Sequence, residues 1–182
     1  MKLSAAFLAA SILAWPLAAH AAMTPGAPTA DPSLSPEANA AFLADNAKKR
    51  GVIVRPDGLQ FKIVQNGFGK RPAVTDSVEV YYTGALINGR VFDGTSPGLP
   101  ASFKVNQVIP GWTEALQLMR EGDHWQLVIP SALAYGARGA GSAIPPDQVL
   151  VFDMTLVSTT PAPKRGEPGY IPDPTDPLDK DK

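Results

Sequence analysis

Five aromatic residues stand where a side chain could take part in chemistry, at predicted strand ends and turns: Tyr82, Phe92, Trp112, Tyr135 and Phe152. Phe92 precedes Asp93 at the exit of a predicted hairpin, Trp112 follows a Pro-Gly pair, and Tyr135 opens a glycine-rich loop. Side chains at such positions can line a cleft instead of filling a core, although for any one of them a core position is the simpler interpretation. Taken singly, each also fits an ordinary core position. Taken together, they predict an apolar binding cleft.

The sequence lacks the residues that covalent catalysis or a metal site would need. The chain contains no cysteine, which excludes thiolate catalysis and zinc-finger spacing. His124 is the single histidine beyond residue 22, and beside Asp123 at a strand start we expect it to be a solvated surface residue, not part of a Ser-His-Asp triad. The glycine-containing segments 67–71 and 136–141 match neither a phosphate loop nor a dinucleotide fingerprint. We therefore predict no metal site and no cofactor.

Composition and charge limit the number of domains and the kinds of partner that this chain can have. The chain has 182 residues, of which 45% are hydrophobic, and this is enough for one domain with a real core plus extensions. The formal net charge is -1 and the basic residues are scattered, so we expect no nucleic-acid partner.

Residues 1–22 have the pattern of a cleaved signal peptide. Lys2 is followed by an apolar run over residues 5–17 and by Ala19-His20-Ala21, a small-residue cleavage site. Pro16 interrupts the apolar run and no charged stop-transfer flank follows it, which argues against a stable membrane anchor. We predict a periplasmic or secreted mature protein.

The elements that must position the aromatic residues form an α+β unit. Trp112, Ala115, Leu116 and Met119 fall on one apolar stripe of a short helix that ends before Gly122. Strands are predicted over residues 59–64, 77–83, 102–105, 125–129 and 148–157, and Asn88-Gly89 predicts a hairpin. We predict an antiparallel sheet of about five strands that forms a half-barrel wrapped on the one short helix.

Two further segments flank this unit. Residues 23–50 are expected to form a flexible lead-in and a short helix with Ser35 as its N-cap. Because Phe42 and Leu43 are the only large apolar residues of that helix, we expect one of them to rest on the domain and the chain to be a monomer. Residues 158–182 are rich in Pro and Asp and are predicted to be a disordered tail.

Several short motifs occur in a specific order: Val80-Tyr81-Tyr82-Thr83-Gly84, Asn88-Gly89, Phe92-Asp93, Val108-Ile109-Pro110-Gly111-Trp112, Ala134-Tyr135-Gly136, Ile144-Pro145-Pro146 and Leu150-Val151-Phe152. In this order and spacing they resemble the FK506-binding (FKBP-type) peptidyl-prolyl cis-trans isomerases, over residues 51–157. The Val-Ile-Pro-Gly-Trp run and the Phe-Leu-Ala-Asp-Asn-Ala-Lys-Lys helix before the domain most resemble the exported, macrophage-infectivity-potentiator-like branch.

The resemblance implies a pocket with Trp112 as its floor. Its substrate-binding residues would be Tyr82, Phe92, Val108, Trp112, Ile144 and Phe152. As catalytic residues, Ile109 would hold the peptide carbonyl through its backbone N–H, Tyr135 would donate its hydroxyl to a substrate carbonyl, and Asp93 would act electrostatically near the rotating amide. Asp93 could equally cap a turn or pair with Arg138 or Tyr82.

Three positions depart from the family pattern. Ala101 stands where a pocket aromatic is expected, and Ala140 and Ala143 replace a histidine and an isoleucine that are common in eukaryotic members. The missing aromatic predicts a weaker pocket wall near Ala101, and the three alanines leave the affinity for FK506 open.

The resemblance further implies an isomerase that acts on Xaa-Pro bonds of exported proteins during folding, in a dry pocket and without a covalent intermediate. Its partners would be proline-containing polypeptides, with FK506 or rapamycin as inhibitors. An alternative from another class is a weakly catalytic or non-catalytic chaperone module that binds peptides in the same pocket, and Ala101 and Ala140 motivate it.

Overall fold

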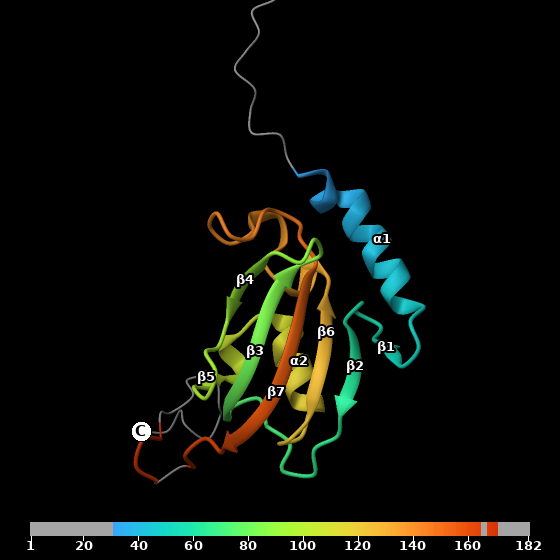
Figure 1. Cartoon of the computed structure of the whole chain (residues 1–182). Helices are drawn as coiled ribbons and strands as arrows, with labels where there is room; N and C mark the ends of the chain where they lie inside the picture. The colour runs from blue at the N-terminus through green and yellow to red at the C-terminus, as the bar shows by residue number, and fades with distance from the viewer. Residues whose placement is uncertain (1–30, 165–166, 171–182) are drawn as a thin grey trace, which may run out of the picture.

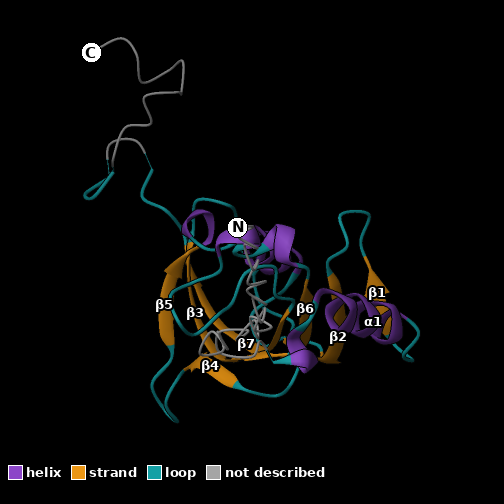
Figure 2. Ribbon diagram, turned by 90° about the horizontal axis from the view of Figure 1, so that it is seen from above, coloured by secondary structure: helices purple, strands orange, loops and turns teal. Residues whose placement is uncertain are grey.

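The structure is a computed structural model that describes residues 31–164 and 167–170. Its centre is one sheet of seven strands, paired antiparallel throughout, in the order β1-β2-β6-β7-β3-β4 with β5 beside β3. Figure 1 shows the long strands β3 and β7 side by side in the middle of the sheet, and Figure 2 shows the strands curving around the space in which α2 lies. The predicted half-barrel on a short helix is confirmed.

The strands cover the predicted segments and add two short ones. Their bounds are β1 Val52–Val54, β2 Gln60–Gln65, β3 Ser77–Leu86, β4 Val91–Gly94, β5 Ala101–Lys104, β6 His124–Ile129 and β7 Leu150–Thr160. β1 and β4 were not predicted as strands because three or four residues are too few to show an alternating pattern. Along β3 burial alternates strictly, with Val78, Val80 and Tyr82 facing the core, as its sequence predicts.

Helix α2 spans Pro110–Leu118 and fills the concave side of the sheet. Pro110 occupies the first turn, where its missing N–H leaves no partner unsatisfied. The predicted stripe is buried: Trp112, Ala115, Leu116 and Met119 are each at most 4% exposed. Gly111 allows the helix to approach β6, because a Cβ there would lie 2.5 Å from Cγ2 of Ile129. The helix therefore presents its first turn, and Trp112 with it, directly to the sheet.

Helix α1 spans Pro36–Ala47 and lies at the edge of the sheet beside β1 and β2 (Figures 1 and 2). Ser35 caps it by accepting the Ala38 N–H, as predicted. Phe42 and Leu43 are only half-buried. The fully buried side chains of α1 are instead Asn39 and Asn46, so the helix is held mainly by polar contacts that its apolar pattern did not indicate.

The Asn39 side chain is the centre of the α1 contact. Its Nδ2 donates to the carbonyl oxygen of Leu34 and to Oε1 of Gln148, and its Oδ1 accepts the Val149 N–H at 2.8 Å. Further along the helix, Asn46 donates to Oε1 of Gln60 at 2.9 Å. Buried amides whose donors and acceptors are all paired fix orientation more sharply than an apolar contact does. Helix α1 is thus docked on the folded unit, as a helix that needs a supporting surface should be.

The predicted tail begins later than the sequence indicates. Strand β7 continues to Thr160, so residues 158–160 pair with the start of β3 and belong to the sheet. The Ala162 N–H also donates to Oδ1 of Asp76. Residues 158–160 are therefore strand and not tail, and the polar run Ser158-Thr159-Thr160 did not indicate this in the sequence. Residues 165–166 and 171–182 of the predicted tail, and the predicted signal peptide, residues 1–22, lie outside the described residues.

Among the described residues, no helix combines the length and the apolar character needed to cross a membrane.

Candidate active site

An aromatic hollow of about 360 Å³ opens between the start of α2 and strands β3, β4, β5 and β7. We call it the aromatic hollow; its lining residues are Tyr82, Phe92, Asp93, Phe103, Gln107, Val108, Ile109, Trp112, Tyr135 and Phe152. Each of these elements contributes one or two side chains to the lining. The lining residues are scattered between positions 82 and 152, and the curvature of the sheet brings them together. A concave, mostly apolar site with a few polar groups is the usual form of a ligand pocket.

Trp112 forms the floor of the hollow and is surrounded by the edges of three other rings. Its ring centroid lies 5.0 Å from that of Tyr82, 5.5 Å from Phe103 and 5.2 Å from Phe152, with interplanar angles of 77° to 87°. Edge-to-face pairs at these distances are favourable by about 0.5 to 1.5 kcal/mol each beyond the area that they bury. The floor is therefore rigid, and the walls are held in place by it.

Gly84 creates the space between two of these walls. It lies opposite Phe152 in the β3–β7 pairing. A Cβ at this position would lie 2.7 Å from the Phe152 ring and 2.8 Å from the Phe92 ring, closer than real side chains approach. Phe92 and Phe152 can thus meet edge to face at 5.7 Å only because residue 84 has no side chain. The sequence contains this clue, since a glycine inside a strand often marks a close approach.

The rim of the hollow carries one carboxylate, which is held in place. The Tyr82 hydroxyl donates to Oδ2 of Asp93 at 2.7 Å, and the Gly94 N–H donates to Oδ1 at 2.8 Å. One of the alternatives for Asp93, a pair with Tyr82, is therefore observed. Burial and, after it, the hydrogen bond to Asp93 raise the pKa of the Tyr82 phenol, so Tyr82 remains a donor at neutral pH.

Two hydrogen-bond donors at the hollow have no acceptor among the described residues. The backbone N–H of Ile109, directly before α2, makes no hydrogen bond there, while its carbonyl accepts from Trp112 and Thr113. The Tyr135 hydroxyl is likewise unpaired within that part of the chain, and the side chain is 42% exposed. Both donors are thus available to a ligand. Trp112 Nε1, buried in the floor and not accessible like the other two, also has no acceptor in the described part of the chain.

The structure brings together all but one of the predicted site residues. Tyr82, Phe92, Asp93, Val108, Ile109, Trp112, Tyr135 and Phe152 line the hollow. Ile144 does not: it is buried in the core cluster, and its backbone pairs with Ala140 in the loop beside the hollow. Its side chain therefore belongs to the core and not to the lining of the hollow.

Sequence reasoning missed Phe103 and Gln107. Ala101 and Phe103 are both half-buried on β5, two residues apart, and it is Phe103 that provides the aromatic wall beside Tyr82 and Trp112. The aromatic ring of β5 thus comes from the second inward position of the strand, while the weaker wall expected near Ala101 stays a prediction. The pairing of β5 with β3, which sets that position, cannot be read from four residues.

The other chemical candidates are accounted for outside the hollow. His124 Nε2 lies 2.6 Å from Oδ1 of Asp153 at the surface of the sheet. Its neighbour Asp123 accepts hydrogen bonds from two backbone N–H groups and does not pair with His124. In the described part of the chain, no three His, Asp or Glu side chains are close enough to hold a metal ion.

Comparisons with known proteins agree with this geometry. The family model described as FKBP-type peptidyl-prolyl cis-trans isomerase matches residues 69–157, and that of the domain amino terminal to it matches residues 26–63. The outer membrane protein MIP of Legionella longbeachae is 51% identical over 123 residues, which are 67% of this chain and 53% of that protein. The FKBP-type 22 kDa peptidyl-prolyl cis-trans isomerase of Escherichia coli is 55% identical over 117 residues, 64% of this chain and 57% of that protein.

Solved structures show the same fold. A peptidyl-prolyl cis-trans isomerase from Pseudomonas syringae superimposes with a TM-score of 0.65 at 41% identity, covering 69% of this chain and 92% of that one. FkpA from Escherichia coli gives 0.66 at 42% identity, covering 69% and 59%. The chain thus spans little more than half the length of the two sequence relatives, but nearly all of the Pseudomonas structure.

Proposed function

Because the chain belongs to the FKBP-type peptidyl-prolyl cis-trans isomerase family, we propose that it accelerates rotation about Xaa-Pro bonds in polypeptides. The observation that carries the proposal is the aromatic hollow itself: a rigid indole floor, aromatic walls, and two unpaired donors at the rim. A proline ring is a small apolar group, and the hollow has the size and lining to enclose it.

The reaction requires no nucleophile, which agrees with the residues present. Rotation about the amide faces a barrier of about 18 to 20 kcal/mol, because resonance keeps the bond planar and places negative charge on the oxygen. An environment with little water disfavours this charge-separated planar form relative to the twisted one. A thousandfold to hundred-thousandfold acceleration needs only about 4 to 7 kcal/mol of differential stabilisation.

We assign the three polar groups to distinct tasks. The Ile109 N–H holds a substrate carbonyl at the start of α2, and Tyr135 donates its hydroxyl to another carbonyl across the hollow. Asp93 faces the amide nitrogen side and acts through its charge. The Tyr82 hydroxyl fixes that carboxylate, so a small rotation of Asp93 cannot remove the charge from the site. Tyr82, Phe92, Val108 and the other lining side chains enclose the ring.

A protease-coupled assay on short peptides that differ in the residue before proline tests the proposal. We expect acceleration that rises with enzyme concentration and is abolished by FK506 or rapamycin, which we expect to occupy the same hollow. Failure to accelerate any peptide, with binding retained, would establish the alternative of a chaperone module. Phe103 in the wall weighs against the part of that alternative that rested on Ala101.

We also propose that the protein works outside the cytoplasm after cleavage near residue 22. The signal-like pattern of residues 1–22 supports this, and the name of the Legionella relative places that protein in the outer membrane. Cell fractionation combined with N-terminal sequencing of the mature protein tests it. An intact N-terminus on cytoplasmic protein would refute it.

The mature protein is proposed to be a monomer. In support, the two large apolar side chains of α1, Phe42 and Leu43, are half-buried, and its two buried asparagines are already paired. Little of α1 is left for a coiled-coil seam. Sedimentation at micromolar concentration decides, and a mass of two chains would contradict the proposal.

A further inference from the structure

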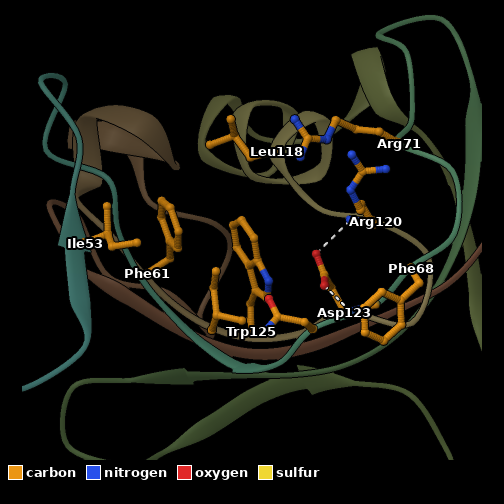
Figure 3. A pocket seen from close by; sticks show the side chains of 11 residues that line it. Ile53, Phe61, Phe68, Arg71, Leu118, Arg120, Asp123 and Trp125 are labelled. Carbon is orange, nitrogen blue, oxygen red and sulfur yellow. Dashed lines mark hydrogen bonds between the residues drawn. The ribbon is translucent and has the colours of Figure 1, made fainter.

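A second, larger hollow of about 580 Å³ lies at the opposite end of α2 from the aromatic hollow (Figure 3). It is bounded by Leu118 near the end of the helix, by β1, β2 and β6, and by the loop 66–71. The two hollows share no lining residue. We call this one the arginine hollow. Nothing in the isomerase chemistry described above uses it.

One wall of the arginine hollow is apolar and extends out to solvent. Phe61 and Trp125 stack face to face with ring centroids 4.3 Å apart and an interplanar angle of 8°. Ile53 on the edge strand β1 is 46% exposed beside them, and Phe68 on the opposite rim is 93% exposed. A fully exposed phenylalanine at the mouth of an apolar hollow adds to the surface that a partner could cover.

The other wall carries two guanidinium groups without a carboxylate partner. Arg71 and Arg120 lie side by side above the hollow in Figure 3. Arg120 Nη1 donates only to the Gly69 carbonyl at 3.3 Å, and Arg71 makes no hydrogen bond or ion pair with the described residues. Two neighbouring guanidinium groups with no ion-pair partner among the described residues favour an anionic ligand.

The carboxylates near the two arginines are already engaged by backbone amides. Asp123 accepts the N–H groups of Gly67 and Arg120, the dashed lines in Figure 3. Glu121 accepts those of Lys70 and Thr159. These bonds hold the loop 66–71 against the start of β6, and they direct the carboxylates toward the backbone. Within the described residues, neither carboxylate forms an ion pair with Arg71 or Arg120, so both guanidinium groups can still pair with a carboxylate from outside.

A third observation points to the same place. Trp125 is 3% exposed, and its Nε1 is buried without an acceptor. In Figure 3 the indole nitrogen lies on the edge of the ring that faces Asp123. Buried polar groups in folded proteins are nearly always paired, so an unpaired indole N–H in the wall of a hollow indicates a missing acceptor.

We propose that the arginine hollow binds a short acidic and apolar segment of another polypeptide. An aromatic or aliphatic side chain of that segment packs against Trp125 and Phe68, and a neighbouring carboxylate lies between Arg71 and Arg120. A peptide fits better than a small anion because the apolar surface continues past the hollow onto Ile53 and Phe68. The proposal does not depend on isomerase activity.

The test is a fluorescence-anisotropy titration of the full mature chain with a labelled, proline-free peptide of sequence Gly-Asp-Leu-Phe-Asp-Gly. We expect saturable binding that weakens at least tenfold in the Arg71→Ala/Arg120→Ala double variant. Alanine at 120 keeps the backbone N–H that caps Asp123, so the fold is preserved. Phe68→Ala should weaken binding about three- to tenfold without affecting folding, since that side chain is almost fully exposed.

Matched controls separate this site from others. Lys104→Ala removes an exposed cation from β5, at the other side of the sheet, and should leave the affinity unchanged. A peptide with Lys in place of Asp should not bind. Equal binding of the Lys peptide, displacement by FK506, or unchanged affinity in the double variant would each overturn the proposal. A tenfold gain on removal of residues 171–182 would assign the hollow to the chain's own acidic tail and overturn the choice of partner.

Discussion

Replacing Trp112 by alanine should separate the contribution of the pocket floor to stability from its contribution to catalysis. The indole is 4% exposed and contacts three rings. A tryptophan buries about 150 to 250 Å², which at about 25 cal/mol per Å² corresponds to about 4 to 6 kcal/mol. Truncation of buried aromatic residues typically costs about 3 to 5 kcal/mol. Both estimates, from buried area and from typical truncations, put the loss of unfolding free energy near 4 kcal/mol.

This loss should appear as a fall in Tm of about 12 to 20 °C for a domain of this size. The proline ring would also lose its contact with the indole, an apolar contact worth about 1.5 to 3 kcal/mol. We therefore expect kcat/KM to fall by about 10- to 100-fold at a temperature where the variant is fully folded. Urea unfolding followed by circular dichroism gives the first quantity, and the protease-coupled assay gives the second.

Leu156→Ala is the matched control for this experiment. Leu156 is fully buried on β7 but lines neither hollow. Its truncation should cost about 2 to 5 kcal/mol, with kcat/KM unchanged below the Tm. If Trp112→Ala lost less than about 1 kcal/mol, the floor would not be packed as described. If Leu156→Ala lost as much kcat/KM as Trp112→Ala, the indole would have no specific role.

Four further changes test other parts of the structure. Tyr135→Phe should leave the Tm unchanged and lower kcat/KM by no more than about tenfold, which corresponds to one hydrogen bond of about 0.5 to 1.5 kcal/mol. A clear fall in Tm would show that the Tyr135 hydroxyl has a hydrogen-bond partner within the folded chain. Gly84→Ala should destabilise by about 1 to 3 kcal/mol through overpacking and lower kcat/KM, which urea unfolding and the isomerase assay measure together. Asn39→Ala should lower the free energy of unfolding by about 2 to 4 kcal/mol, because the buried Gln148 side chain and the Val149 N–H both lose their hydrogen-bond partner. An unchanged chemical denaturation curve would mean that α1 does not dock on the domain. The pKa of Tyr82 is higher in the folded chain than in the unfolded chain, so above pH 10 the unfolded chain releases this proton first and the free energy of unfolding falls as pH rises toward the folded pKa. Absorbance at 295 nm should show one tyrosine that ionises only when the chain unfolds. In the Tyr82→Phe variant this late ionisation should be missing.

The sequence indicated the elements whose own residues carry a periodic pattern. The stripe of α2 from Trp112 to Met119 and the alternation of β3 are local signals, and both are buried as their spacing predicts. The docking of α1 was not visible, because Asn39 is polar and its partner Gln148 lies 109 residues away. A buried amide pair depends on tertiary placement, and no window of sequence contains both members.

The same distinction applies to the site. Motif spacing placed Trp112, Tyr135 and Asp93 correctly around the hollow. It could not decide whether residue 101 or 103 brings the ring of β5 into the wall, since both face inward and the pairing with β3 decides how far each reaches. The arginine hollow was also missed: residues 53, 68, 71 and 120 meet only after β1, β2 and α2 have packed.

The positions of the tryptophans have a practical consequence for spectroscopy. Of the three in the sequence, Trp15 lies in the segment that we expect to be removed, so the mature chain would keep Trp112 and Trp125. One forms the floor of the aromatic hollow and the other forms a wall of the arginine hollow. Their intrinsic fluorescence therefore reports on separate surfaces. A chain in which Phe replaces one indole would emit from the other alone, so ligands at the two ends of α2 could be followed independently without a label.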